Sequence, residues 1–298
     1  MENTRTKTTR NSLILLLTAA IWGMAFVSQS KGMDYMHPFT FNGVRSLIGA
    51  ASILVYILIS RKIAGDKAAP LDWKLNVKAG LLCGIFLTIA STLQQFGIKY
   101  TSVGKAGFIT TLYIIFVPMF GIFLKKKVAP VVWAAAVMAA VGMYLLCMTE
   151  SLRLGAGDIM VFLCAIAFAI QIMTVDHYAT RIDGAVVSCI QFTVCGVVCC
   201  IGALIWGQPT FGQLQEGLGA LLYAGVLSCG VGYTLQIVGQ KGLNPTVAAL
   251  IMSLESVIAT ISGWIAYKIG FLTTDQTLTA RQIAGLSLIH ISEPTRPY

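Results

Sequence analysis

Seven stretches of this chain contain no Asp, Glu, Lys or Arg, and this pattern limits the folds open to it more than any other feature. They cover residues 11–30, 79–98, 106–124, 128–149, 159–175, 184–215 and 217–240. A helix needs roughly 17–25 predominantly apolar residues to cross the hydrocarbon core of a bilayer, and most of these stretches are long enough. Only 11% of all residues are charged, whereas soluble proteins average about 25%. The sequence therefore predicts an all-α membrane protein that crosses the bilayer many times.

The apolar stretches and the charges between them predict ten transmembrane helices joined by short loops. The spans are 12–30, 38–60, 76–98, 103–124, 129–148, 158–178, 184–206, 217–239, 245–267 and 280–291. With the N-terminus in the cytoplasm, the inner segments carry fourteen Lys and Arg residues and the outer segments carry five. Because cytoplasmic loops are enriched in Lys and Arg, we expect both termini to be cytoplasmic.

A stretch of 35 residues occurs twice in the chain. Residues 92–126 align without gaps with residues 234–268, which lie 142 positions later, and ten of the aligned pairs are identical. Each half then holds five spans, and since five is odd, the second half enters the bilayer from the opposite side. We therefore expect two inverted five-helix repeats, residues 12–148 and 158–291. Secondary transporters often have this architecture, with the substrate site near the midplane between the repeats.

Short motifs add to this pattern. The first span holds Ala20-Ile21-Trp22-Gly23 and Phe26, the second holds Arg45, the fourth begins at Thr101-Ser102-Val103-Gly104-Lys105-Ala106-Gly107-Phe108, and the ninth holds Ala249-Leu250-Ile251-Met252-Ser253-Leu254-Glu255-Ser256-Val257. With ten spans and a repeated half, the chain resembles the EamA-type members of the drug/metabolite transporter superfamily over residues 12–290. The resemblance implies a bacterial inner-membrane transporter of small metabolites without an ATP site, whose central cavity is lined by spans 1–4 and 6–9. Where the family often has Glu-Pro in the ninth span, this chain has Glu255-Ser256, so the resemblance does not extend to a proline-induced distortion there.

The C-terminal end departs from the family pattern. A tenth span should continue for about 20 apolar residues, but the apolar run 283–291 is followed at once by Ser292-Glu293-Pro294-Thr295-Arg296-Pro297. We interpret residues 286–298 as a non-native tail that truncates the tenth helix. The alternative is a short, tilted last helix.

Several other classes of function are disfavoured. The net charge of +9 is typical of nucleic-acid binding, but the Lys and Arg residues lie mainly in short loops, where they set membrane orientation. The eight cysteines all fall in apolar runs and none forms a C-x-x-C motif beside a histidine, so we expect packing roles and no metal site. The chain has no Walker A, G-x-S-x-G or H-E-x-x-H motif. We therefore expect neither an enzyme nor a bound cofactor.

Three ionisable residues fall deep in predicted spans, where charges are costly and mark functional sites. Glu255 lies near the midplane among small residues, and is a proton carrier, a partner for a substrate amine, or a carboxylate that fixes helix packing. Arg45 shares a helix face with Asn42. It would bind a substrate carboxylate, pair with Glu255, or extend to the outer headgroups. For Lys105, near the outer surface, we favour extension to the headgroups over contact with a ligand.

Uncharged residues complete the predicted substrate site. Gln94 and Gln236 are equivalent positions of the repeat, and each either lines the transport pathway or forms a hydrogen bond between helices. Tyr113 is the repeat equivalent of Glu255 and supplies a hydroxyl group or an aromatic wall opposite it, or packs. Trp22 shapes the cavity or packs. The predicted substrate-binding residues are thus Glu255, Arg45, Gln94, Gln236, Tyr113, Trp22 and Asn42.

The function that these features favour is secondary transport of a small metabolite, an amino acid or a related compound, by alternating access. We expect export, with Arg45 and Glu255 binding opposite charges of the substrate. The expected partners are a small-molecule metabolite and the lipid bilayer, and not nucleic acid, while proton coupling and a homodimer stay open. The alternative is a membrane scaffold or sensor that transports nothing.

Overall fold

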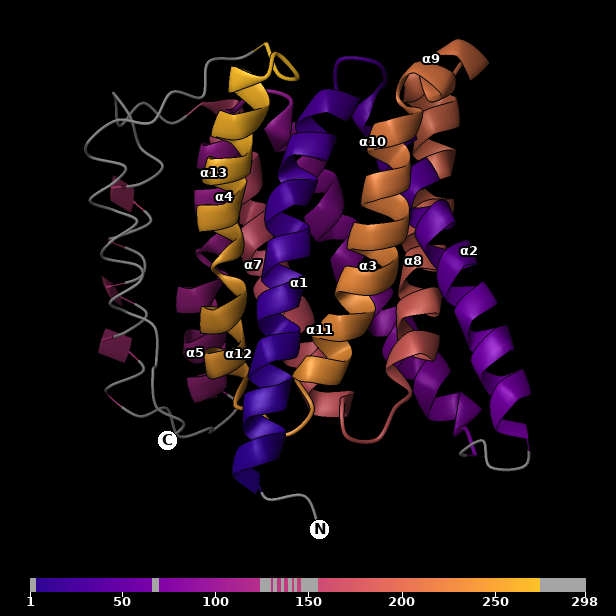
Figure 1. Ribbon diagram of the computed structural model, residues 1–298, viewed down its shortest axis with the longest axis vertical. Coiled ribbons are helices and arrows are strands. Elements are labelled where there is room, and N and C mark those ends of the chain that lie inside the picture. The colour runs from indigo at the N-terminus through magenta and orange to yellow at the C-terminus, as the bar shows by residue number, and fades with distance from the viewer. Residues whose placement is uncertain are drawn as a thin grey trace.

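The computed structural model describes residues 4–65, 70–123 and 155–273, together with scattered positions between 130 and 145. Within these residues the regular elements are all helices, and the long ones run side by side as one bundle (Figure 1). The prediction of an all-α fold is confirmed for this part of the chain.

The helices follow the predicted spans closely. Four spans are single helices: α1 (Thr4–Gly32), α2 (Pro38–Ala64), α3 (Trp73–Ile98) and α7 (Ala156–Tyr178). Four more are built from consecutive elements: α4 (Val103–Thr111) with α5 (Tyr113–Phe123); α8 (Gly184–Gly202) with the π-helix η2 (Ala203–Gly207); α10 (Leu218–Leu222), the π-helix η3 (Tyr223–Gly232) and α11 (Tyr233–Gly239); and α12 (Pro245–Met252) with α13 (Glu255–Lys268). The short helix α9 (Phe211–Glu216) precedes α10.

Eight of these helical segments are long and apolar enough to cross a membrane. They match eight of the ten predicted spans. The predicted spans 129–148 and 280–291 and the suspected tail 286–298 lie outside the described residues, apart from scattered positions in the first of these ranges. The count of ten therefore stays a prediction.

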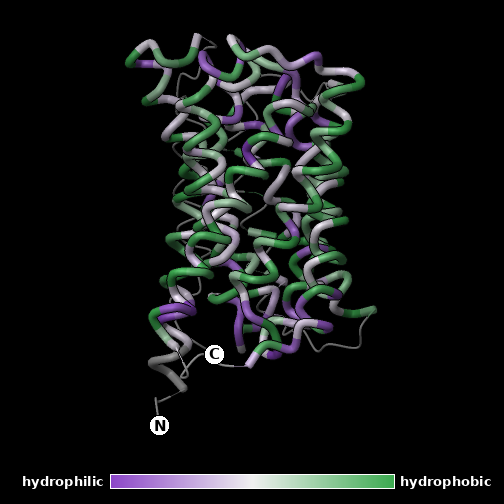
Figure 2. The backbone as a smooth tube through the Cα atoms, turned by 90° about the vertical axis from the view of Figure 1, so that its right-hand side faces the viewer, coloured by the Kyte–Doolittle hydropathy of each residue, from purple (hydrophilic) through white to green (hydrophobic). Residues whose placement is uncertain are grey.

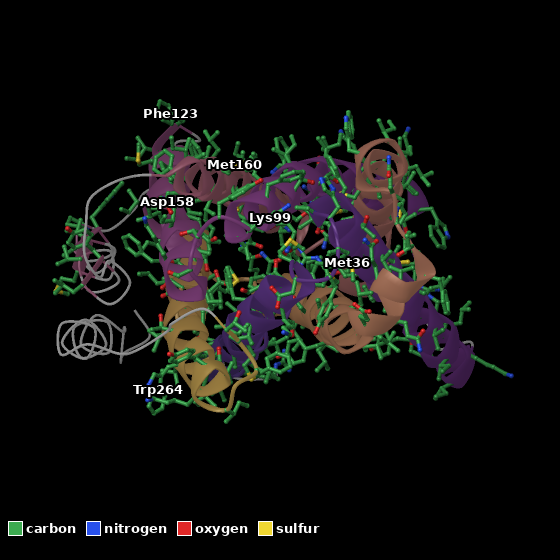
Figure 3. The ribbon with its side chains drawn as sticks, turned by 90° about the horizontal axis from the view of Figure 1, so that it is seen from above. Met36, Lys99, Phe123, Asp158, Met160 and Trp264 are labelled. Atoms are coloured by element: carbon green, nitrogen blue, oxygen red, sulfur yellow. The ribbon has the colours of Figure 1, made fainter. Side chains whose placement is uncertain are left out.

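The outer surface of the bundle is apolar, as a lipid environment requires. Large hydrophobic side chains such as Phe123 and Leu204 are strongly exposed. Figure 2 shows hydrophobic residues along the length of the bundle, with hydrophilic residues more frequent toward its two ends. Seen from above, the labelled Phe123 and Trp264 lie at the rim of the bundle (Figure 3). Since such a surface would be unfavourable in water, the chain is a multi-pass membrane protein.

The long helices of the first half of the chain pack against those of the second half. Helix α2 packs along α8, and α3 packs against α7 and α8. Correspondingly, the segment α10–η3–α11 packs against α1 and α2. Helices α4 and α5 contact α7, whereas α12 and α13 contact α1, and α4 also contacts α13. In Figure 1, α4 lies above α5 but α12 lies below α13, so these two broken helices cross the bundle in opposite directions.

Both broken helices are interrupted at equivalent positions of the repeat. The first breaks at Leu112, and the second at Ser253 and Leu254. At each break a hydroxyl group donates a hydrogen bond to the carbonyl three residues earlier, from Thr111 to Phe108 at 2.9 Å and from Ser253 to Leu250 at 2.7 Å. Such bonds compete with the helical ladder and bend helices. The ninth predicted span is therefore distorted even though Glu255 is followed by Ser256 and not by proline.

Glycines allow α3 and α7 to approach closely at one end of the bundle. A Cβ atom on Gly97 would lie 2.8 Å from the carbonyl oxygen of Gly157, and a Cβ atom on Gly157 would lie 2.8 Å from the carbonyl oxygen of Gly97. These are backbone atoms, so neither helix can yield without moving as a whole. Close approach at small residues is the usual basis of helix packing in membranes.

We expect Gly97→Ala to lower the free energy of unfolding by about 1–3 kcal/mol, because overpacking a tight contact costs this much. The matched control is Gly219→Ala in α10, where a Cβ atom would meet nothing within 4 Å. Thermal unfolding of the purified protein in detergent measures both. Equal midpoints for the two variants would show that the α3–α7 contact is not as tight as described.

Candidate functional site

A cavity lies inside the bundle, at the level of the two helix breaks. Its space for water-sized molecules is about 40 Å³, enough for about three waters at roughly 10–15 Å³ each. It is lined by Trp22, Ala25, Phe26 and Gln29 of α1; Asn42, Arg45 and Ser46 of α2; Leu87, Ser91 and Gln94 of α3; Thr110 of α4; Tyr113 of α5; Phe168, Gln171 and Ile172 of α7; Phe192 of α8; Ser228 and Cys229 of η3; Tyr233 and Gln236 of α11; and Glu255 of α13.

All seven residues of the predicted substrate site line this cavity. They come from six helices, and the chain positions of the first and last differ by more than two hundred residues. The structure therefore brings the predicted set together in one place.

Glu255 and Tyr113 meet in the middle of the bundle. The Tyr113 hydroxyl donates a hydrogen bond of 3.0 Å to Oε1 of Glu255. Tyr113 is 2% exposed and Glu255 is 4% exposed. Each residue is the first of its helix, α5 for Tyr113 and α13 for Glu255. The N-terminal end of a helix carries a partial positive charge, so this position favours a carboxylate. The repeat equivalents thus bond directly to each other, 142 positions apart.

Arg45 is buried, with 5% of its surface exposed. Its Nε donates a hydrogen bond of 2.9 Å to Oδ1 of Asn42, and its guanidinium carbon lies 5.5 Å from the ring centroid of Phe41. Asn42 in turn donates to the Ser91 hydroxyl at 3.1 Å. Of the three alternatives for Arg45, extension to the headgroups is therefore wrong.

Arg45 and Glu255 face one cavity without pairing with each other. In the described part of the chain, ion pairs join Lys31 to Asp34 and Lys105 to Asp158, and neither Arg45 nor Glu255 takes part in one. The alternative that the two form an ion pair is therefore also wrong for this structure. The cavity wall holds a basic group and an acidic group, each available to an opposite charge.

The two repeat-related glutamines have different partners. Gln94 donates a hydrogen bond of 3.2 Å to the Thr110 hydroxyl, and Gln236 donates one of 3.2 Å to the side-chain oxygen of Gln171. Both are buried. The two readings of the sequence are thus compatible, since each glutamine lines the cavity and also bonds to a neighbouring helix.

Aromatic rings form another part of the wall. The ring centroids of Trp22 and Tyr233 are 4.5 Å apart, and those of Phe192 and Tyr233 are 4.9 Å apart. The Trp22 indole donates a hydrogen bond of 3.4 Å to the carbonyl oxygen of Ser228, in the π-helix η3. Trp22 therefore both shapes the cavity and holds α1 against η3.

Several residues of the cavity wall are not among the predicted site residues, above all Tyr233, Phe192 and Ser91. A usable signal existed for two of them. Ser91 and Tyr233 lie three residues before Gln94 and Gln236 on the same helix face, and are themselves 142 positions apart. For Phe192 no such signal exists, because its place depends on how α8 packs. Among the described residues, no cluster of His, Cys, Asp and Glu is suited to a metal ion.

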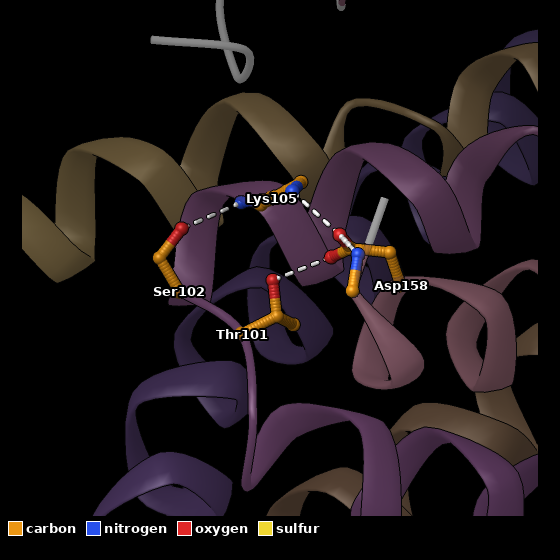
Figure 4. A network of polar contacts seen from close by, with 5 residues as sticks. Thr101, Ser102, Lys105 and Asp158 are labelled. Atoms are coloured by element: carbon orange, nitrogen blue, oxygen red, sulfur yellow. Dashed lines mark hydrogen bonds and ion pairs between the residues drawn. The ribbon is translucent and has the colours of Figure 1, made fainter. Parts of the chain in front are cut away.

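Lys105 does not extend to the headgroups as expected. Its ammonium forms an ion pair of 2.6 Å with Asp158 in the first turn of α7 (Figure 4). Asp158 also accepts hydrogen bonds of 2.8 Å from the Thr101 hydroxyl and from the backbone N–H of Gly155. The Asp158 side chain is 4% exposed and that of Lys105 is 20% exposed. This network joins α4 to α7 at the end of the bundle where both helices begin.

We expect Lys105→Met to lower the free energy of unfolding by about 1–3 kcal/mol, because it leaves a buried carboxylate without its cation. The control is Lys31→Met, which breaks a more exposed pair with Asp34 that is worth about 1 kcal/mol or less. A double-mutant cycle with Asp158→Asn isolates the coupling, measured by thermal unfolding. A coupling no larger than that of the Lys31 pair would contradict the buried network.

Comparisons with known proteins agree with this architecture. A model of the EamA-like transporter family matches residues 10–148 and again residues 155–292. A solved crystal structure superimposes with a TM-score of 0.72 over 96% of this chain and 95% of that one, at 17% sequence identity. At that identity the likeness concerns the fold alone.

Curated relatives are named as transporters whose activity is uncharacterised. The transporter YwfM of Bacillus subtilis is 26% identical over 289 residues, which cover 96% of this chain and 94% of that protein. A transporter of Clostridium kluyveri is 25% identical over 84% of this chain and 83% of its own length. One from Archaeoglobus fulgidus is 30% identical over 171 residues, which span 55% of this chain and about half (48%) of that relative.

Proposed function

The chain belongs to the EamA-like transporter family of the drug/metabolite transporter superfamily, and we propose that it moves a small zwitterionic metabolite, such as an amino acid, by alternating access. The observation that carries the proposal is the pair of opposite charges in the cavity wall. Arg45 and Glu255 are both buried, both line the cavity, and in the described part of the chain neither forms an ion pair.

The charges favour a zwitterion over other small molecules. A buried charge without a counter-charge is costly, so a ligand that brings one charge for each residue gains from both. A carboxylate would bind the Arg45 guanidinium, whose planar donors suit that group, while an ammonium would bind Glu255. A singly charged ligand would leave one of the two residues uncompensated, and a ligand without charged groups would leave both.

An inverted repeat is supported by the composition of the cavity wall. Six pairs of lining residues lie 142 positions apart, the separation of the two sequence copies: Phe26 with Phe168, Gln29 with Gln171, Leu87 with Cys229, Ser91 with Tyr233, Gln94 with Gln236, and Tyr113 with Glu255. Two inverted halves, 12–148 and 158–291, related by an axis through the cavity would place equivalent residues on opposite walls in this way.

The helix arrangement supports the same proposal. The broken helices α4–α5 and α12–α13 run in opposite directions, and each contacts a helix of the other half (Figure 1). Discontinuous helices at the midplane recur at the substrate sites of transporters. In our proposal, the two halves rock about the Tyr113–Glu255 contact, and the Lys105–Asp158 pair closes one end of the pathway in the state described.

We further propose that the protein lies in a bacterial inner membrane with both termini in the cytoplasm, because the predicted inner segments hold most of the Lys and Arg residues. Export is the direction that we propose for transport, and it rests on the family alone. Membership of a transporter family favours a role without catalysis. The second candidate is a scaffold or sensor: a scaffold needs no charged cavity, and a sensor that binds a ligand there would show no flux.

Flux measurements in proteoliposomes test the proposal. We expect wild-type protein to move at least one zwitterion from a panel of labelled amino acids, and Glu255→Gln and Arg45→Gln to reduce that flux by about tenfold to a hundredfold, since each loses a charge-assisted contact. The controls Glu216→Gln and Arg181→Gln change exposed residues outside the cavity and should keep wild-type flux. Absence of flux for the whole panel would favour the scaffold or sensor.

Proton coupling is tested separately. If Glu255 carries the proton, flux should respond to an imposed pH gradient in the wild type and lose that response in Glu255→Gln. Tyr113→Phe removes the hydrogen bond to the carboxylate but keeps the acid, and should retain the response. Flux that ignores the gradient, together with an active Glu255→Gln variant, would assign the carboxylate a structural role.

A further inference from the structure

Three buried glutamines form a continuous chain of side-chain hydrogen bonds across three helices. Nε2 of Gln236 in α11 donates to Oε1 of Gln171 in α7 at 3.2 Å. Nε2 of Gln171 then donates to Oε1 of Gln191 in α8 at 3.4 Å. The exposed fractions are 1% for Gln236 and 0% for the other two. The amides therefore all donate in one direction, from α11 through α7 to α8.

This chain of three glutamine side chains leaves one unpaired atom at each end. The side-chain oxygen of Gln236 is buried without a hydrogen-bond partner, and so is the side-chain nitrogen of Gln191. Gln236 and Gln171 line the cavity, whereas Gln191 does not. Gln236, at one end of the glutamine chain, thus both lines the cavity and carries an unpaired acceptor. An unpaired buried acceptor is unfavourable, and a group that donates to it gains the whole of that cost.

The described residues of the first half of the polypeptide have no such arrangement. The repeat equivalents of Gln171 and Gln236 are Gln29 and Gln94, which also line the cavity. Gln94 donates to Thr110 instead, and the Gln29 side-chain oxygen is unpaired with no side-chain partner that orients it. Gln236 differs from both because its unpaired oxygen belongs to an amide held by Gln171, which is itself bonded to Gln191. A fixed acceptor binds a donor with a smaller loss of conformational freedom than a mobile one.

We propose that the Gln236 side-chain oxygen accepts a hydrogen bond from a neutral O–H or N–H group of the transported metabolite, so that the cavity prefers zwitterions with a hydroxyl or carboxamide side group over their apolar counterparts. This proposal rests on the proposed function. Arg45 and Glu255 bind the two charges of the substrate, and Gln236 accepts a hydrogen bond from its neutral side group. Gln191 is a positioning residue, because it holds Gln171 and through it the orientation of the Gln236 amide.

A purely structural role makes a different prediction. Hydrogen bonds between transmembrane helices stabilise packing, and a packing role would change unfolding but not the choice between substrates. Gln240 provides the matched comparison. It is also buried, lies at the end of the same helix, and has an unpaired side-chain oxygen, but it does not line the cavity.

The experiment compares matched pairs of amino acids in proteoliposomes. Serine competes with alanine, threonine with valine, and glutamine with methionine, for flux through wild-type protein and through Gln236→Met, Gln191→Met and Gln240→Met. We expect the wild type to prefer the polar member by about tenfold, the change that one well-formed neutral hydrogen bond produces. The preference should fall to about twofold or less in Gln236→Met and Gln191→Met, and persist in Gln240→Met.

A conservative variant separates positioning from folding. Gln191→Glu keeps an oxygen that accepts from Gln171, so the polar preference should return in it although the side chain has changed. Thermal unfolding of every variant identifies one that fails to fold, and the wild-type preference stands independently of the variants.

The outcomes are distinct. Flux of zwitterions with equal preference for polar and apolar members, or a polar preference that survives Gln236→Met, would overturn this proposal and leave the proposed function standing. In that case the Gln236 oxygen binds water only. Absence of flux for every amino acid would overturn the proposed function and this proposal together.

Discussion

The hydrocarbon core of a bilayer offers no hydrogen-bond partners. This constraint governs both the backbone conformation and the placement of polar side chains in this protein. The backbone must satisfy itself, which is why the described spans are helices. The breaks in α4–α5 and α12–α13, at Leu112 and at Ser253–Leu254, lie beside the buried residues Thr111 and Ser253, whose hydroxyl groups bond to carbonyls. Broken backbone is tolerated at membrane depth when it lies inside protein, and here the breaks start the two helices whose first residues, Tyr113 and Glu255, meet at the cavity.

The same constraint sorts the polar side chains. Many are fully engaged between helices, such as Asp158 with Lys105, Thr101 and Gly155, and these hold the bundle together. Others line the cavity without an ion-pair partner or with an unpaired atom: the Glu255 carboxylate and the Arg45 guanidinium form no ion pair in the described part of the chain, and the Gln236 side-chain oxygen has no hydrogen-bond partner. In a low-dielectric interior such groups are costly, and our proposals assign them to a polar ligand.

Family membership and cavity chemistry supply different information. The family and its relatives establish a transporter, but folds host many substrates, and specificity must be argued from the residues of a site. The relatives from Bacillus subtilis and Clostridium kluyveri, which align with most of this chain, are about a quarter identical to it and are themselves named as uncharacterised. The asymmetry between the two halves carries the specificity in our proposals, since Tyr113 opposes Glu255 and the glutamine chain lies in the second half, without a counterpart among the described residues of the first.

The sequence by itself determined the fold class, the positions of the eight described spans, and a set of seven residues that all line the cavity. It could do so because apolar length and charge placement are local properties from which a bilayer selects transmembrane helices, and because the repeat marks equivalent positions in the two halves. It did not determine the partners of those residues. Lys105, predicted to reach the headgroups, pairs with Asp158, and Arg45 bonds to Asn42. The Gln171–Gln191–Gln236 chain joins α7, α8 and α11, and Phe192 of α8 packs against Tyr233 of α11. Only the tertiary structure decided these contacts, because helix rotation and packing, and not the order of residues along the chain, choose which polar groups meet.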